Sequence, residues 1–223
     1  MDKRLILQPV FDDKEGVSMG AEVFTRVHTE HRIVSPTELV EAGDDAPYNW
    51  RTMDLGALRL LLRSEEERGE EGVLFVNIAE ETLSAPAIYH DWLDELAMLV
   101  KARQDAGPVM VEIKDNNDLA EPYLGNCIRS IRDAGAGICL DNFGNKFATR
   151  SHLFSFDWDY VKCDWRPFNR SDDVWQSIVA ASNHCYENGI EGVLLGVEET
   201  EDIFRARELG FKLMQGFFFG GEI

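Results

Sequence analysis

The sequence predicts an α/β protein, a TIM-like (β/α)8 barrel formed by a single domain over residues 1–223. Short apolar runs of strand length alternate with longer segments that carry apolar residues at helical spacing, which is typical of repeated βα units. Polar motifs follow the apolar runs at their C-terminal ends, where a parallel barrel carries its functional residues. A chain of 223 residues with 44% hydrophobic content is long enough to bury the core of one such barrel.

The individual elements follow from local signals. Apolar runs at 5–11 and 17–26 flank a turn and predict a hairpin. Ser35, Pro36 and Glu38 form a helix-start signal, in which Ser35 can cap and Glu38 follows three positions later. Helices are then predicted over 50–63, 89–103, 119–133, 174–188 and 200–209, and strands over 73–78, 109–113, 137–140, 160–163, 192–197 and 212–215.

The chain is strongly acidic, with 41 Asp and Glu residues against 22 Lys and Arg and a formal net charge of −19. Such a field repels phosphate backbones, so we expect no nucleic-acid partner. We interpret the acid excess as a solvated surface, and steering towards a basic protein partner is the alternative interpretation.

The sequence has no pattern of a membrane span, a signal peptide or a CxxC pair, and these absences indicate the compartment and the state of the cysteines. No apolar stretch approaches the roughly 18 residues of a membrane span. Residues 1–4 lead into a strand pattern without a signal-peptide apolar region. We therefore expect a cytoplasmic protein that does not bind membranes. Cys127, Cys139, Cys163 and Cys185 have no CxxC spacing, which indicates buried free thiols.

The stretch 137–164 contains the polar residues of greatest functional interest. Its first apolar run ends in Asp141, Asn142 and Gly144, as a buried parallel strand does when it delivers polar groups to a site. Twenty-one residues after Asp141, a second apolar run carries Lys162 and is followed by Asp164. A lysine in such a run requires a partner or a function.

Ordered motifs over nearly the whole chain resemble those of EAL domains, the bacterial phosphodiesterases and receptors of cyclic di-GMP. The segments 141–144 and 162–164 resemble the family's DDFG and KID motifs, at a spacing that needs no gap. Further matches are Gln8-Pro9-Val10 to QPI, Glu22 to Arg26 to EALLR, Val76-Asn77-Ile78 to VNLS, Glu112 to the first residue of ELTES, Gly196-Val197-Glu198 to GVE, and Gln215-Gly216 to QG. The resemblance implies a barrel with one antiparallel strand. The helices that usually precede the first strand and follow the last have no counterpart in this sequence.

The resemblance also implies a metal and nucleotide site at the strand ends. Hard cations such as Mg²⁺ or Mn²⁺ take carboxylate and amide oxygens. The positions that match the family's first-metal ligands are Glu22, Asn77, Glu112 and Asp141. Lys162 matches the residue that orients water and phosphate, Arg26 matches a phosphate contact, and Gln8, Asp164 and Gln215 are further candidate ligand-binding residues. A purely structural role stays open for Asn77 at a strand end and for Lys162 in a buried ion pair.

Two departures from the family pattern bear on catalysis. Asn142 stands where the family has a second Asp that helps to bridge two metals, and a neutral amide lacks that charge. Leu195 stands where the family has a Glu, and it offers neither a metal ligand nor a proton acceptor. Loss of a general base typically costs about 10²- to 10⁴-fold in rate. We therefore expect negligible turnover and at most one weakly bound Mg²⁺ or Mn²⁺.

Two further stretches depart from the family. Residues 145–148 replace a small loop that, in the family, supports the second metal and couples to dimerisation. We interpret Lys146 there as an exposed loop lysine, and phosphate binding is the alternative. At the C-terminus, alternation along Phe217 to Phe219 predicts that at least one ring has no place within the domain. Cover by the helix over 200–209 is one alternative; docking on a further domain, a second copy or a partner is the other.

Three functional interpretations follow, from three different classes. The first is a degenerate EAL-domain pseudo-enzyme that works by binding another protein. The second is a non-catalytic receptor for cyclic di-GMP, and the third is a weak one-metal phosphodiesterase. Asn142 and Leu195 argue against the third. Retained Gln8 and Arg26 favour ligand binding, the rewritten loop disfavours it, and we rank partner binding first.

Overall fold

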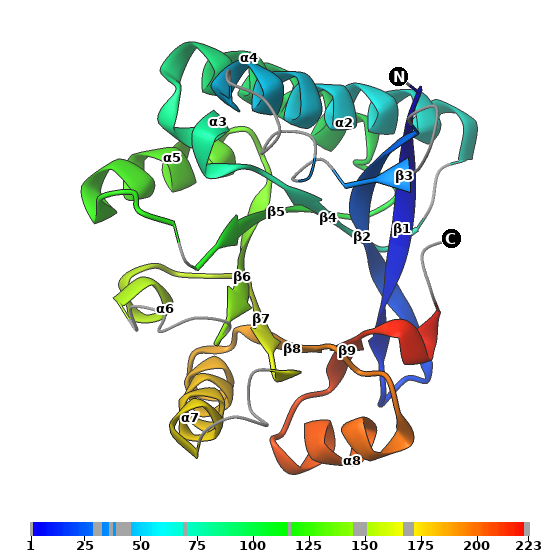
Figure 1. Ribbon diagram of the computed structural model, residues 1–223, viewed down its shortest axis with the longest axis vertical. Coiled ribbons are helices and arrows are strands. Elements are labelled where there is room, and N and C mark those ends of the chain that lie inside the picture. The colour runs from blue at the N-terminus through cyan, green and yellow to red at the C-terminus, as the bar shows by residue number, and fades with distance from the viewer. Residues whose placement is uncertain are drawn as a thin grey trace.

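The computed structural model describes residues 2–28, 33–35, 38, 46–68, 71–115, 117–144, 151–166 and 172–220. Within these ranges the strands form a closed barrel, with helices packed around much of its outside (Figure 1). This arrangement confirms the predicted α/β barrel.

The barrel wall is a mixed sheet. Its strands are β1 (Asp2–Asp12), β2 (Val17–His28), β3 (Ile33–Val34), β4 (Val73–Asn77), β5 (Val109–Lys114), β6 (Gly137–Phe143), β7 (Tyr160–Asp164), β8 (Glu191–Leu195) and β9 (Leu213–Gln215). Their order is β1-β9-β8-β7-β6-β5-β4-β2-β3, and a β1–β2 pairing closes the ring, with β3 as a short edge on β2. Because β1 runs antiparallel to both β2 and β9 while the remaining neighbours in the ring are parallel, β1 is the expected antiparallel strand.

The described helices are α2 (Ala46–Arg68), α3 (Glu80–Ser84), α4 (Pro86–Ala102), α5 (Glu121–Asp133), α6 (Ser151–Ser155), α7 (Asp172–Asn188) and α8 (Thr200–Glu208). The sequence analysis missed α3 and α6, which have five residues each and therefore too few turns to show a helical period. Asp54 of α2 anchors the start of α3, since its carboxylate accepts hydrogen bonds from the Ala79 N–H at 3.1 Å and the Thr82 hydroxyl at 2.5 Å.

Apolar residues pack on both sides of the strands. The larger cluster fills the space between the barrel wall and the helices and includes Trp92, Leu96 and Ile138, all fully buried. A smaller cluster lies inside the barrel and contains Val10, Val73, Phe75, Met110, Cys139, Val193, Leu195 and Leu213. Side chains alternate along a strand, so residues two positions after a member of this inner cluster also face the barrel interior. On the parallel strands these residues lie closer to the C-terminal mouth of the barrel. The inner face thus places polar side chains above an apolar floor.

The predicted helix start at Ser35 is partly described. The Glu38 N–H donates to Ser35 Oγ at 3.3 Å, and the Ser35 N–H donates to Glu38 Oε1 at 3.3 Å, which is the reciprocal pattern of a capping box. Pro36 and Thr37 lie outside the described residues. Lys146 and the rest of the rewritten loop over 145–148 also lie outside them.

The three consecutive phenylalanines form a 3-10 turn (η2, Phe217–Phe219), not the extended segment that the alternation argument assumed. A turn directs consecutive side chains to different sides instead of alternating them across a sheet. Phe217 is 61% exposed and Phe218 is 45% exposed, whereas the ring of Phe219 stacks on Phe11 with centroids 4.6 Å apart. Two rings therefore lie at the surface, and a partner for them remains a prediction.

Two other expectations can be compared with the described residues. Cys127, Cys139, Cys163 and Cys185 are all buried and free, as predicted. In the ranges that the structure describes, no helix combines the length and the apolar character needed to cross a bilayer.

Candidate functional site

The candidate site residues all lie on barrel strands, at or near the C-terminal mouth. By strand they are Gln8 (β1), Glu22 and Arg26 (β2), Asn77 (β4), Glu112 (β5), Asp141 and Asn142 (β6), Lys162 and Asp164 (β7), Leu195 (β8) and Gln215 (β9). The strand register makes several of them direct neighbours. Asn77 pairs with Glu112 across β4 and β5, and Leu195 lies between Asp164 and Gln215 across β7, β8 and β9.

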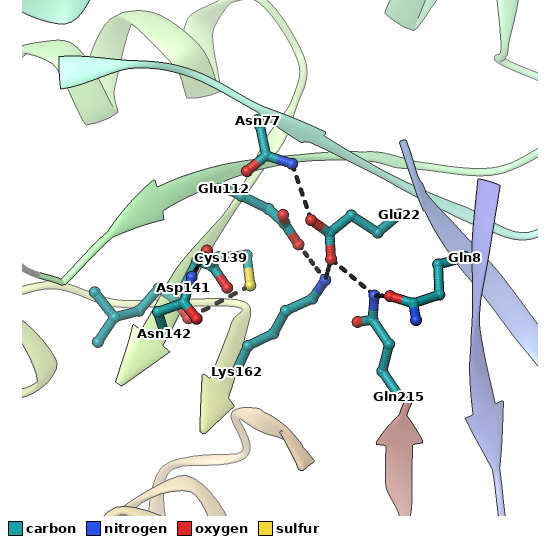
Figure 2. A network of polar contacts seen from close by, with 10 residues as sticks. Gln8, Glu22, Asn77, Glu112, Cys139, Asp141, Asn142, Lys162 and Gln215 are labelled. Atoms are coloured by element: carbon teal, nitrogen blue, oxygen red, sulfur yellow. Dashed lines mark hydrogen bonds and ion pairs between the residues drawn. The ribbon is translucent and has the colours of Figure 1, made fainter. Parts of the chain in front are cut away.

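The fully buried ammonium group of Lys162 lies at the centre of the site (Figure 2). It donates to Glu22 Oε2 at 2.7 Å and forms a second, close ion pair with Glu112 Oε1. The ammonium also lies 4.5 Å from the centroid of the Phe75 ring, which forms the apolar floor below it. The lysine therefore has two carboxylate partners and no access to solvent.

Amide groups complete the hydrogen bonding of Glu22. Asn77 Nδ2 donates to Glu22 Oε1 at 2.9 Å, and Gln215 Nε2 donates to Glu22 Oε2 at 2.8 Å. Gln215 Nε2 also contacts Gln8 Oε1 at 3.0 Å, so β1, β2, β4 and β9 meet in one network (Figure 2). These contacts bring Gln8, Glu22, Asn77 and Gln215 together as the sequence predicts. Lys162 forms a buried ion pair, the structural role that the sequence left open for it.

The charges of this buried group depend on one another. Burial alone would raise the pKa of Glu22, but the Lys162 ammonium and the neighbouring donors lower it below its usual range. Burial and the negative charge of Glu22 raise the pKa of Glu112 well above the ordinary value. Burial alone would lower the pKa of Lys162, and the carboxylates of Glu112 and Glu22 raise it instead. The lysine charge therefore stabilises the ionised form of Glu22, while burial and the charge of Glu22 disfavour the ionised form of Glu112.

Asp141 and Asn142 occupy an irregular end of β6. The pairing of β6 with β7 shifts register between Leu140 and Phe143, and Asn142 adopts a φ of 57°. Asn and Asp tolerate this left-handed conformation better than other residues with a Cβ. The Asn142 amide donates to Asp141 Oδ2. Burial and then the charge of Glu22 raise the pKa of Asp141 to about 6.

Two cavities open beside this network. A larger one of about 780 Å³ is lined by Arg26, Asn77, Asp141 and Asn142 among others, and a smaller one of about 260 Å³ is lined by Gln8, Asn142, Leu195 and Gln215 among others. Both include Glu22, Phe24 and Asp141 in their walls. Arg26 thus faces the larger cavity, where its guanidinium donates to the Thr25 carbonyl at 3.1 Å. Leu195, one of the two residues that depart from the family pattern, faces the smaller cavity.

Arg166 is a site residue that the sequence analysis missed. Its guanidinium grips the buried carboxylate of Asp164 in a bidentate pair, with Nε donating to Oδ1 at 2.8 Å and Nη2 donating to Oδ2 at 2.7 Å. The Arg166 side chain is 55% exposed and lines the smaller cavity. The only sequence signal was its position two residues after Asp164. At the end of a strand, a spacing of two residues does not predict an ion pair between the two side chains.

By chemistry the donors suit one hard cation, but among the described residues no three His, Cys, Asp or Glu side chains converge to hold a metal ion, and the Lys162 ammonium lies between Glu22 and Glu112. The donors are Glu22, Asn77, Glu112 and Asp141, and the buried Glu112 Oε2 has no hydrogen-bond partner among the described residues. Such an ion would supply positive charge next to a bound phosphate. In the smaller cavity Asn142 and Leu195 are neutral, and the carboxylate of Asp164 is engaged by Arg166.

The model of the EAL domain family matches residues 3–221, nearly the whole barrel. The chain belongs to the EAL domain family. This EAL domain is 32% identical to the cyclic di-GMP phosphodiesterase RocR of Pseudomonas aeruginosa over 132 residues, which is 55% of this chain and 32% of that protein. It is 22% identical to the cyclic di-GMP phosphodiesterase PdeL of Escherichia coli over 226 residues, which is 96% of this chain and 60% of that protein.

Solved structures show the same fold. A manganese and cyclic di-GMP complex of Klebsiella pneumoniae BlrP1 aligns with a TM-score of 0.82 and 21% identity over 100% of this EAL domain and 56% of that chain. An EAL domain protein from Listeria monocytogenes aligns with a TM-score of 0.77 and 21% identity over 99% of this chain and 88% of the other. At these identities the likeness establishes the barrel and does not establish a ligand.

Proposed function

We propose that this EAL domain is a regulatory protein of cyclic di-GMP-type signalling that acts by binding another protein and does not hydrolyse a phosphodiester. The single observation that carries the proposal is the lining of the smaller cavity. Asn142 and Leu195 face it at the two positions where the family pattern has acidic groups. Without them the site lacks the second bridging carboxylate of the family pattern and has no general base at position 195.

The protein partner in this proposal is argued from surface and charge. Phe217 and Phe218 expose two aromatic rings side by side in sequence, and exposed apolar groups of this kind are frequent at interfaces. The net charge of −19 would favour a partner with a basic surface. A second copy of the chain or a further domain at this edge is the alternative occupant.

The first prediction is that the purified protein does not convert cyclic di-GMP to the linear dinucleotide above a no-enzyme control, with either Mg²⁺ or Mn²⁺ present. The physical reason is the joint loss of acidic groups at Asn142 and Leu195. Chromatography of the nucleotides after a long incubation measures the conversion. Several turnovers per protein molecule that disappear in a Glu22→Ala variant would show instead that the site is a weak one-metal phosphodiesterase.

A receptor for cyclic di-GMP is the second candidate function, and the two cavities at the strand ends favour it. Gln8 and Gln215 border the smaller cavity and Arg26 borders the larger. Klebsiella pneumoniae BlrP1 has been solved with FMN and cyclic di-GMP and no metal ions. Vibrio cholerae LapD has been solved bound to cyclic di-GMP. These ligands are properties of those proteins, and for this EAL domain they supply the probe to be used.

The second prediction separates the receptor from the protein-binding interpretation. If the domain is a receptor, calorimetry with cyclic di-GMP should detect binding, and Arg26→Ala should weaken it at least about tenfold because a charge-assisted contact to phosphate is lost. Arg51→Ala is a matched control, because Arg51 is an exposed arginine that pairs with Asp91 on the helices. Equal heats for wild type and Arg26→Ala would place the bound nucleotide elsewhere. No heat at high ligand concentration would leave protein binding as the function.

A further inference from the structure

Arg166 places a positive charge in the smaller cavity at the point where acidic residues are missing. Asn142 and Leu195 line that cavity without charge, and the exposed guanidinium of Arg166 lines it together with the acidic Glu22, Asp141 and Glu198. A divalent cation next to a guanidinium is repelled by like charge, while an anion is attracted. The smaller cavity thus has a cationic side chain of its own beside the two positions where the carboxylates of the family pattern are absent.

The guanidinium is rigidly positioned. Asp164 is buried at the end of β7 and receives Nε at 2.8 Å, Nη2 at 2.7 Å and the backbone N–H of Arg166 at 3.1 Å. Gly196 provides the room for this side chain, because a Cβ at that position would lie 2.8 Å from Cγ and Cδ of Arg166. A bidentate pair of this kind fixes the plane of the guanidinium as well as its position.

The bidentate pair uses only part of the hydrogen-bonding capacity of Arg166. A guanidinium has five N–H donors, and the Asp164 carboxylate takes one from Nε and one from Nη2. The Arg166 side chain is 55% exposed, so its remaining N–H donors can be reached by a ligand. Phosphate and phosphodiester oxygens match such donors in geometry and charge.

We propose that Arg166, held by Asp164, is a built-in cation that takes the place of a second metal ion and binds an anionic oxygen of a phosphodiester ligand in the smaller cavity. The proposal deepens the receptor form of the proposed function, on which it rests for its ligand, and it concerns the same strand-end site. It makes nucleotide binding independent of added divalent metal. It also assigns Asp164 the role of positioning Arg166, not of contacting the ligand directly.

The experiment is a calorimetric titration with cyclic di-GMP in the presence of EDTA, using wild type, Arg166→Ser and Arg166→Lys. Wild type should bind, Arg166→Ser should bind at least about tenfold more weakly, and Arg166→Lys should be intermediate because it keeps the charge and loses the planar fork. Arg207→Ser is the matched control, since Arg207 makes the same bidentate contact with Asp13, at 2.7 and 2.8 Å, and lines neither cavity. Circular dichroism of each variant checks that it is folded, and Arg166→Lys carries the test if Arg166→Ser does not fold.

Three outcomes would overturn the proposal: equal affinity of wild type and Arg166→Ser, binding by wild type that requires Mn²⁺ or Mg²⁺, and no binding of cyclic di-GMP at all. Chromatography of parallel samples that contain Mn²⁺ in place of EDTA keeps the two proposals distinguishable, because hydrolysis requires the metal. Linear product would contradict the absence of hydrolysis without altering the Arg166 comparison. Loss of binding in Arg166→Ser without any product would support both.

Discussion

Replacing Lys162 with methionine should lower the free energy of unfolding by about 3–5 kcal/mol, the cost of leaving buried charge without its partner. Glu22 and Glu112 both contact the Lys162 ammonium, and both side chains are buried, Glu112 completely. Urea denaturation of wild type and variant measures the difference. A loss below about 1 kcal/mol would show that the carboxyl groups do not depend on the lysine.

The same variant should show a pH dependence of known sign. In wild type the raised pKa of Lys162 contributes stability that is fully present below its unfolded pKa of about 10.4 and is lost only as the pH rises through the folded pKa. In Lys162→Met, Glu22 and Glu112 lose their cation, so the pKa of Glu22 rises above the unfolded value of about 4.3, and that of Glu112, already raised, rises further. Such acids bind more protons in the folded state, and their destabilisation grows as the pH rises. The stability gap between wild type and variant should therefore be smaller at pH 5 than at pH 8.

A compensated variant is the control for Lys162→Met. Combining it with Glu22→Gln and Glu112→Gln removes the charges together with the lysine, and stability should recover in part because no uncompensated ion remains buried. The triple variant should also lose the pH-dependent gap. If the triple variant is as unstable as Lys162→Met at every pH, the lost interaction is packing of the lysine stem on Phe75 and not charge.

The combined variant Asn142→Asp and Leu195→Glu should gain affinity for Mn²⁺ and hydrolyse cyclic di-GMP at least about 100-fold faster than wild type, the lower end of what a general base contributes. Aspartate suits position 142 because it tolerates the observed φ of 57°. Leu195 lies at the edge of the inner apolar cluster and also lines the smaller cavity, so a glutamate there can reach the ligand space. Calorimetry with Mn²⁺ and chromatography of the nucleotides give independent readouts.

Arg166 should limit the gain in Mn²⁺ affinity of the combined variant. If its guanidinium takes the place of a second cation, adding Arg166→Ser to the combined variant should raise Mn²⁺ affinity further, because the like charge is removed and Asp164 is released. Glu22→Gln in the same background should abolish the gain. A combined variant that neither binds Mn²⁺ nor turns over would show that positions 142 and 195 are not what limits the site.

Much of the fold could be predicted from the sequence, because its determinants are local and repeated. Strand and helix periods identified the barrel, and the helices that were missed, α3 and α6, are too short to show a period. For Phe217–Phe219, side-chain alternation was assumed beyond the last predicted strand, whereas the segment forms a 3-10 turn. The glycines at 216 and 220 bound that turn, and the backbone of Phe218 is held by the Val197 carbonyl at 3.0 Å from another loop.

The sequence by itself indicated the polar side chains at the strand ends and the two neutral residues among them, Asn142 and Leu195, since motif spacing places these residues at strand ends, but it did not indicate Arg166. Only the tertiary structure decided how those side chains pair. Lys162 contacts Glu22 across 140 residues of sequence, and Arg166 turns back onto Asp164 in a segment without a regular period. Protonation was likewise undetermined, because the pKa values of Glu112 and Asp141 depend on burial and on charges from other strands. Ion pairs in the mouth of a barrel depend on the distances between side chains of different strands, and the residue pattern of a single strand does not predict those distances.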